Sequence, residues 1–99
     1  MDKRTPTYDL EAIKDSVKND GARTTLSAKK SMTKLRINLA DVESCILMLD
    51  RSNFYKSMTT HNDHRVWQDV YHASYLGHDL YVKIMVDDEG YLVVSFKEL

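Results

Sequence analysis

The sequence predicts an α+β fold, with an antiparallel sheet of about four strands packed by two to three N-terminal helices. Apolar side chains recur at helical spacing before residue 50, whereas after it they alternate with polar ones at the spacing of strands. The chain has 99 residues, of which 42% are hydrophobic, and this suffices for one core. We therefore expect a single domain over residues 1–99.

Three helices are expected in the first half. Thr7 is a candidate N-cap for the first, which Gly21 can end by adopting a left-handed conformation. A second, short helix is expected to begin at Thr24 or Thr25. Asn38 can cap the third. The apolar stripe of this third helix comprises Leu39, Val42, Cys45, Ile46 and Leu49.

Four strands are expected in the second half. Their approximate ranges are Phe54–Thr60, Val66–Tyr71, Leu80–Val86 and Tyr91–Lys97. Residues 61–64 favour a turn between the first two strands, and residues 87–90 suit a hairpin between the last two. Side chains alternate cleanly in the last two strands, so one face should be core. The other face should present Tyr81, Lys83, Ser95 and Lys97.

The second strand is expected to add a polar side chain to that outer face. If Trp67 and Tyr71 point to the core, then Gln68 lies on the same face as Tyr81 and Lys97. An amide, a phenol and an ammonium group would then share one surface.

Lys56 is harder to place, because in a regular strand its side chain points to the same face as those of Phe54 and Met58. Its position on the outer face requires either that these two residues line the surface or that a β-bulge intervenes. The alternation alone leaves both arrangements open.

Charged side chains are unevenly distributed along a chain whose formal net charge is −1. Residues 1–49 contain nine Lys/Arg and seven Asp/Glu, whereas residues 50–99 contain five and eight. No acidic residue lies between positions 23 and 40, a segment that can either follow RNA phosphates or form an ordinary solvated face. Its basic residues are Arg23, Lys29, Lys30, Lys34 and Arg36.

The single cysteine, Cys45, cannot form an intrachain disulfide and lies within an apolar helical stripe. We expect it to be a buried small hydrophobic residue in a protein of the reducing cytoplasm. No apolar run approaches membrane-spanning length, so we expect neither a signal peptide nor contact with a membrane.

Lys56, Gln68, Tyr81 and Lys97 would together supply two cations, an amide and a phenol. Cleavage of RNA requires a proton acceptor for the 2′-hydroxyl, donors that stabilise the crowded phosphorane and an acid for the leaving 5′-oxygen. A lysine crowded by other cations has a lowered pKa and could exchange a proton, as could a tyrosine near cations. Outward Lys and Tyr side chains can also be merely solvated, so spacing alone leaves a structural explanation open.

Three rival sites are less favoured. A metal could bind His61 and His64 with Asp63, but these residues lie in an expected loop where their spacing fixes no geometry. A pair drawn from His61, His64, His72 and His78 could exchange protons, although exposed histidines explain the pattern more simply. The segment 87–89, Asp-Asp-Glu, could bind a divalent cation, yet a solvated hairpin tip explains it better. We therefore expect no metal and no other cofactor.

Several motifs closely resemble the MqsR toxins, the motility quorum-sensing regulators of bacterial toxin–antitoxin modules. The resemblance implies a RelE-like microbial ribonuclease fold and a metal-independent endoribonuclease that cuts mRNA at short GC-containing sites. It also implies a cognate MqsA-type antitoxin that neutralises the toxin, with DNA contacted only indirectly through that antitoxin. The motifs are Lys3–Pro6, Arg23–Thr25, Phe54–Thr60, Asp63-His64, Trp67–Tyr71, Tyr81-x-Lys83-Ile84 and Val94–Glu98.

The active residues proposed for that family fall on Lys56, Gln68, Tyr81 and Lys97. The lysines are expected to bind and stabilise the scissile phosphate, Tyr81 to transfer a proton or stack on a base, and Gln68 to position a phosphate or base edge. RNA binding is expected from Arg23, Lys29, Lys30, Lys34, Arg36 and Lys83. The alternative is a non-catalytic module that binds RNA or an antitoxin without cutting.

Overall fold

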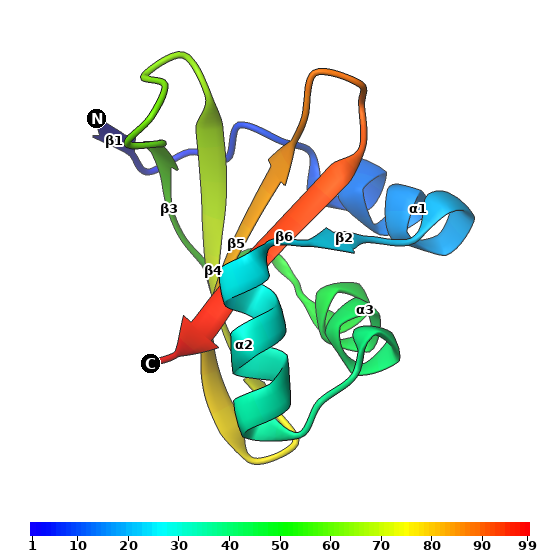
Figure 1. Ribbon diagram of the computed structural model, residues 1–99. Helices are drawn as coiled ribbons and strands as arrows, with labels where there is room; N and C mark the ends of the chain where they lie inside the picture. Colours follow the sequence, from blue (N-terminus) through cyan, green and yellow to red (C-terminus); the bar gives the residue numbers. More distant parts are fainter.

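The computed structural model describes residues 1–99, which form three α-helices, one 3-10 turn and a six-stranded sheet (Figure 1). The helices are α1 (Leu10–Asp20), α2 (Leu26–Leu35) and α3 (Leu39–Met48), and the turn is η1 (Arg51–Asn53). The strands are β1 (Asp2–Lys3), β2 (Arg23–Thr24), β3 (Phe54–Thr59), β4 (Trp67–Tyr75), β5 (His78–Val86) and β6 (Leu92–Glu98). No helix has both the length and the apolar character needed to cross a membrane.

The α+β class and the four long strands are confirmed, but the expected total of about four strands is wrong. The sheet has the order β1-β3-β4-β5-β6-β2, so one short strand extends each edge. Both β1 and β2 have only two residues, too few for the alternation that identifies a strand in a sequence. The sheet is also mixed rather than purely antiparallel, because β2 pairs with β6 in the parallel direction.

Local capping signals place α2 and α3 as expected. The Thr25 side chain accepts a hydrogen bond from the Ala28 backbone N–H, and Asn38 forms a reciprocal capping box with Asp41. Thr7 is not the N-cap of α1, whose cap is Asp9. Instead the Thr7 hydroxyl meets that of Ser57 in β3 at 2.7 Å, so a tertiary contact replaces the local one.

The core lies between one face of the sheet and the helices. It comprises 16 buried residues, including Ile13 and Val17 of α1, Ile46 of α3, and Val82 and Val94 of the sheet. The α2 helix packs beside β6, where the Ser31 hydroxyl donates to the Phe96 carbonyl (Figure 1). This contact satisfies a backbone group beyond the end of β2, where the sheet edge is otherwise unpaired.

The segment before α1 is held against the sheet by a buried carboxylate. Asp69 of β4 is 1% exposed, and it accepts backbone N–H bonds from Thr7 at 3.0 Å and Tyr8 at 2.9 Å. Burial, followed by the nearby Asp69 charge, raises the pKa of Tyr71 to about 12. Tyr71 therefore remains a neutral phenol in the core across the physiological range.

Candidate active site

The sheet face opposite the α1 and α3 side is called here the open face, and residues of four strands line it in cross-strand rows. One row joins Lys56, Val70, Lys83 and Ser95 through successive backbone pairs. The next row joins His72, Tyr81 and Lys97. A third pair joins Met58 and Gln68. The open face therefore contains Tyr81, Lys83 and Lys97, as the sequence predicts, together with Gln68 and also Lys56, whose face the sequence leaves open.

A β-bulge places Lys56 on the open face. Phe54 pairs with Tyr71 and Lys56 pairs with Val70, so Tyr55 is the extra residue of β3 at this point. The Phe54 ring meets the Tyr71 ring on the core side, with centroids 5.6 Å apart and planes at 72°. Of the two arrangements that the sequence leaves open, the bulge is therefore the one adopted.

Tyr81 lies at the centre of an aromatic and basic cluster. Its ring centroid is 5.3 Å from the Lys97 ammonium nitrogen, 5.6 Å from the His72 ring and 6.4 Å from the Tyr55 ring. Tyr55 stacks on His72 with centroids 4.4 Å apart. A phenol, an imidazole and an ammonium group are thus neighbours on three adjacent strands.

Lys56 lies one row away and is a permanent cation at neutral pH. Its Nζ is 3.2 Å from Asp2 Oδ2 and 5.4 Å from the Tyr55 ring centroid, and its side chain is 21% exposed. The hydrogen bond that the Lys56 ammonium group donates to Asp2 raises the Lys56 pKa above its usual value. The expectation that crowding by cations lowers a lysine pKa is therefore wrong for Lys56, because its nearest charged partner is a carboxylate.

Gln68 shares the open face but stands apart from this cluster. It precedes His72 by four strand residues, which corresponds to about 13 Å along β4. Its amide nitrogen contacts the Met85 sulfur at 3.8 Å. Gln68 lines a hollow of about 380 Å³, together with Met58, Thr60, His61, His64 and Lys83 among others.

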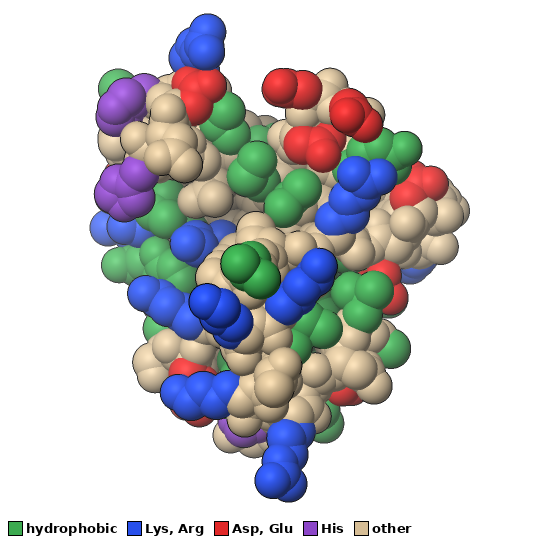
Figure 2. Space-filling model, in the orientation of Figure 1, with side chains coloured by type: hydrophobic (Ala, Val, Ile, Leu, Met, Phe, Trp, Pro, Cys, Tyr) green, Lys and Arg blue, Asp and Glu red, His purple; other side chains and the backbone are tan.

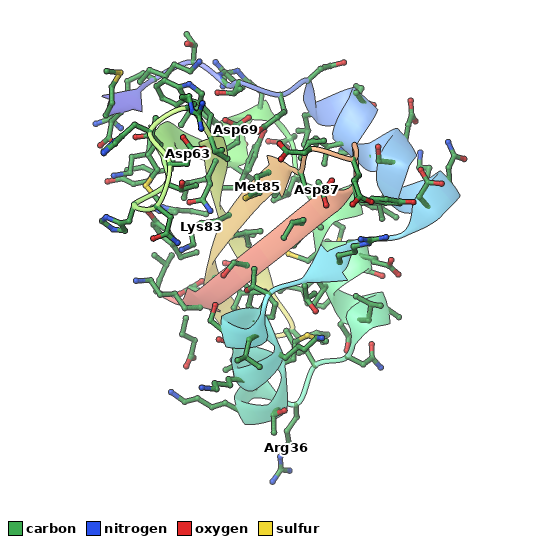
Figure 3. The ribbon with its side chains drawn as sticks, turned by 45° about the horizontal axis from the view of Figure 1, so that its top comes forward. Arg36, Asp63, Asp69, Lys83, Met85 and Asp87 are labelled. Atoms are coloured by element: carbon green, nitrogen blue, oxygen red, sulfur yellow. The ribbon has the colours of Figure 1, made fainter.

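Lys83 connects that hollow with a second one. A depression of about 240 Å³ between α2 and β6 is lined by Ser27, Ser31, Lys83, Ser95, Phe96 and Lys97. Figure 3 shows Lys83 and Met85 along β5, between the loop carrying Asp63 and the strand β6. A basic residue thus lies at the boundary between the two hollows, with Gln68 on one side and Lys97 on the other.

Comparison with known proteins assigns the chain to a family. Residues 5–98 match the family described as the motility quorum-sensing regulator, toxin of MqsA. The chain belongs to the MqsR toxin family. It is 42% identical over 98 residues to the mRNA interferase toxin MqsR of Escherichia coli (strain K12), and the alignment covers 99% of both chains.

In this MqsR family member, basic side chains gather over α2 (Figure 2). At about 100° per residue, Lys30 and Lys34 lie on the flank of α2 that carries Ser27 and Ser31, beside the hollow. Lys29 lies on the opposite flank. The helix therefore has one flank beside the hollow and one turned away from it.

Two arginines of the basic segment are placed away from the cluster. Arg36 is the C-cap of α2 with φ of 59°, and it projects at the far end of the helix from Lys83 (Figure 3). Arg23 of β2 stacks over Tyr91, with its guanidinium carbon 3.6 Å from the ring centroid. The structure therefore does not bring all the predicted RNA-binding residues together.

The acidic and histidine motifs of the loops have structural partners. Asp63 pairs with Arg65 at 3.1 Å, and this hydrogen bond lowers the Asp63 pKa. Asp87 accepts backbone N–H bonds from Glu89 and Tyr91, which closes the β5–β6 turn. No group of three or more His, Cys, Asp or Glu side chains is arranged to hold a metal ion. Cys45 is buried and free, and burial raises the pKa of its thiol.

His72 lies beside the cluster around Tyr81, although on the sequence alone it is only one of four histidines of a less favoured rival site. The expected strand ended at Tyr71, so no face of the sheet was assigned to His72, whereas β4 continues to Tyr75. Continuing the alternation of Gln68 and Val70 by one step would have found it. The second half of β4 pairs with β5, and this contact between separate segments carries the strand beyond Tyr71.

Proposed function

We propose that this chain is an mRNA interferase, an endoribonuclease that cuts mRNA without a metal ion. The observation that carries the proposal is the convergence of Tyr81, Lys97 and Lys56 on one open sheet face, in a chain similar end to end to a curated mRNA interferase toxin. Two lysine side chains beside a phenol provide the charge stabilisation that phosphoryl transfer requires.

The chemistry we assign begins with the scissile phosphate between Lys56 and Lys97. Attack of the 2′-oxygen on phosphorus builds negative charge on the non-bridging oxygens, and the two ammonium groups stabilise that charge. Tyr81 exchanges a proton within the same cluster. The products are a 2′,3′-cyclic phosphate and a 5′-hydroxyl.

Gln68 contributes to substrate positioning rather than to the bond change, because it lies about 13 Å along the strand from the Tyr81 row. Its hollow offers an amide beside apolar Met58 and basic Lys83, which suits a nucleobase edge. Selection of short GC-containing sites would be made there. Lys30 and Lys34 extend the positive surface and follow the RNA backbone.

The proposal includes the partners and the setting that the family implies. A cognate MqsA-type antitoxin binds and neutralises the protein, and contact with DNA occurs only through that antitoxin. The protein acts on mRNA in the cytoplasm. The fold is of the RelE-like kind, a proposal supported by its helices packed on a twisted sheet with a basic open face.

The test is incubation of the purified protein with a defined transcript in EDTA, followed by mapping of the cut ends. We expect cleavage to persist in EDTA and to leave cyclic phosphate and 5′-hydroxyl ends. A strict requirement for added metal, or 5′-phosphate ends, would contradict the proposed chemistry. Tight binding with intact RNA after long incubation would instead support the non-catalytic module.

A further inference from the structure

His72 belongs to the cluster around Tyr81, yet the chemistry assigned to Lys56, Lys97 and Tyr81 does not use it. Its ring centroid is 4.4 Å from that of Tyr55, with planes 26° apart, and 5.6 Å from that of Tyr81. It is half-buried on the open face. Backbone pairing with Tyr81 fixes its position in the row that ends at Lys97.

The imidazole also has an unused polar atom. Nε2 of His72 is the one buried side-chain nitrogen or oxygen of the chain without a hydrogen-bond partner. Buried polar atoms are almost always paired, and an unpaired one calls for an explanation such as a catalytic role or a missing ligand. The other three histidines differ: His61 and His64 are exposed in the β3–β4 loop, and His78 is 3.7 Å from Glu98.

Of the neighbours of His72, the two lysines are poor proton acceptors. Lys56 is held protonated by Asp2, and an ordinary lysine or tyrosine is almost fully protonated at pH 7. Histidine is the side chain whose ordinary titration range includes neutral pH, so it can accept a proton there. The mechanism requires such an acceptor for the 2′-hydroxyl.

We propose that His72 is a catalytic residue of the RNA-cleaving site, acting as the general base toward the 2′-hydroxyl. This inference rests on the proposed function. The neutral imidazole takes the 2′-hydroxyl proton while the 2′-oxygen forms a bond to phosphorus and the bond from phosphorus to the 5′-oxygen breaks. Tyr81 donates a proton to that leaving oxygen and recovers one from the imidazolium, so no proton or water is consumed.

The surrounding charges determine how the rate should depend on pH. The rings that face His72 are those of Tyr55 and Tyr81. Lys56, which binds Asp2, lies over the Tyr55 ring, and Lys97 lies over the Tyr81 ring. Arg4 stacks on the outer side of Tyr55, with its guanidinium carbon 5.5 Å from that ring's centroid. None of these groups ordinarily titrates between pH 5 and 8. A fall in rate on the acidic side of that range would therefore report His72.

The test measures single-turnover cleavage of a short RNA from pH 5 to 9 by wild type, His72→Gln and His78→Gln. We expect His72→Gln to cleave about 100-fold more slowly than wild type at pH 7.5, and its rate should no longer fall on the acidic side of the profile. His78→Gln should keep the wild-type rate and the wild-type pH profile. A His72→Gln rate within threefold of wild type with an unchanged pH profile would overturn the inference. Failure of the wild type to cleave RNA at all would instead contradict the proposed function.

Two further measurements separate catalysis from folding. In wild type, the NMR titration midpoint of the His72 ring should match the midpoint of the acidic limb, and a mismatch would refute the role whether or not the variant folds. If the leaving 5′-oxygen of the RNA is replaced by sulfur, the departing thiolate needs little protonation. This RNA should restore cleavage by Tyr81→Phe but not by His72→Gln. The reverse result would make His72 the general acid and Tyr81 the general base.

Discussion

Lys97 of β6 lies directly opposite Tyr81 of β5, and its ammonium nitrogen is 5.3 Å from the centroid of the Tyr81 ring. The pair lies beside the hollow between α2 and β6, where no acidic side chain competes for the positive charge. Lys97 lines this hollow together with Lys83, so two ammonium groups border it.

Replacement of Lys97 by alanine should slow cleavage at every site by about 100-fold, because it removes a donor that stabilises charge developing in the transition state. The measurement is the rate at each cut site of one long transcript. Gln68→Ala serves as the comparison, and it should change the relative use of sites more than the summed rate. Loss of selectivity in the Lys97 variant alone would contradict this division of roles.

Lys56 should act through its charge and not through proton transfer. Lys56→Arg should therefore keep activity within about tenfold of wild type, whereas Lys56→Ala should lose about 100-fold. Because Asp2 raises the Lys56 pKa, their interaction stabilises the folded protein fully below the ordinary lysine pKa of about 10.4. This stabilisation disappears as the pH rises through the raised value. Cleavage by Lys56→Arg and by wild type should therefore depend on pH in the same way between pH 6 and 9. If a change of rate with pH seen in wild type were absent from Lys56→Arg, Lys56 would instead act as a base.

The two flanks of α2 should differ in their contribution to RNA binding. Lys30→Ala with Lys34→Ala should weaken binding of a 2′-deoxy analogue and reduce the slope of log K against log salt by about 0.7 for each lost phosphate contact. The matched control, Lys29→Ala with Arg36→Ala, removes the same charge from positions turned away from the hollow. Equal losses of salt dependence in the two double variants would show that only net charge matters.

Asp69 should be a stability residue. Asp69→Ala leaves two backbone donors, those of Thr7 and Tyr8, without their acceptor, and the free energy of unfolding should fall by about 3 kcal/mol. Asp79→Ala is the control, since Asp79 is exposed and its carboxylate meets only Ser74, and it should change stability by less than about 0.5 kcal/mol. Urea denaturation measures both, and similar values for the two variants would contradict the anchoring role.

The features that could be predicted from the sequence are those encoded within a few residues. Thr25 and Asn38 identify helix starts because their side chains bond to backbone groups three residues away. The open-face positions of Tyr81, Lys83 and Lys97 follow from alternation within β5 and β6. Each of these signals is local, so no knowledge of the partner strand is needed.

The remaining features depend on contacts between distant segments. The bulge at Tyr55 is defined by the register with β4, and the Lys56 pKa is raised by Asp2, which lies 54 residues earlier in the chain. Thr7 contacts β3 and β4 instead of capping α1, and β1 and β2 exist only as partners of longer strands. The place of His72 on the open face was not predicted for the same reason, since pairing with β5 extends β4 beyond the expected end at Tyr71.

The central claim, that the cluster around Tyr81 cleaves RNA, is tested most directly by comparing Tyr81→Phe with Tyr75→Phe in the same cleavage assay in EDTA. Each variant removes one phenolic hydroxyl, but the Tyr75 hydroxyl meets Asp41 on the core side of the sheet, 3.4 Å away. Tyr81→Phe should cleave about 100-fold more slowly than wild type, whereas Tyr75→Phe should match it. Equal rates for wild type and Tyr81→Phe would contradict the claim.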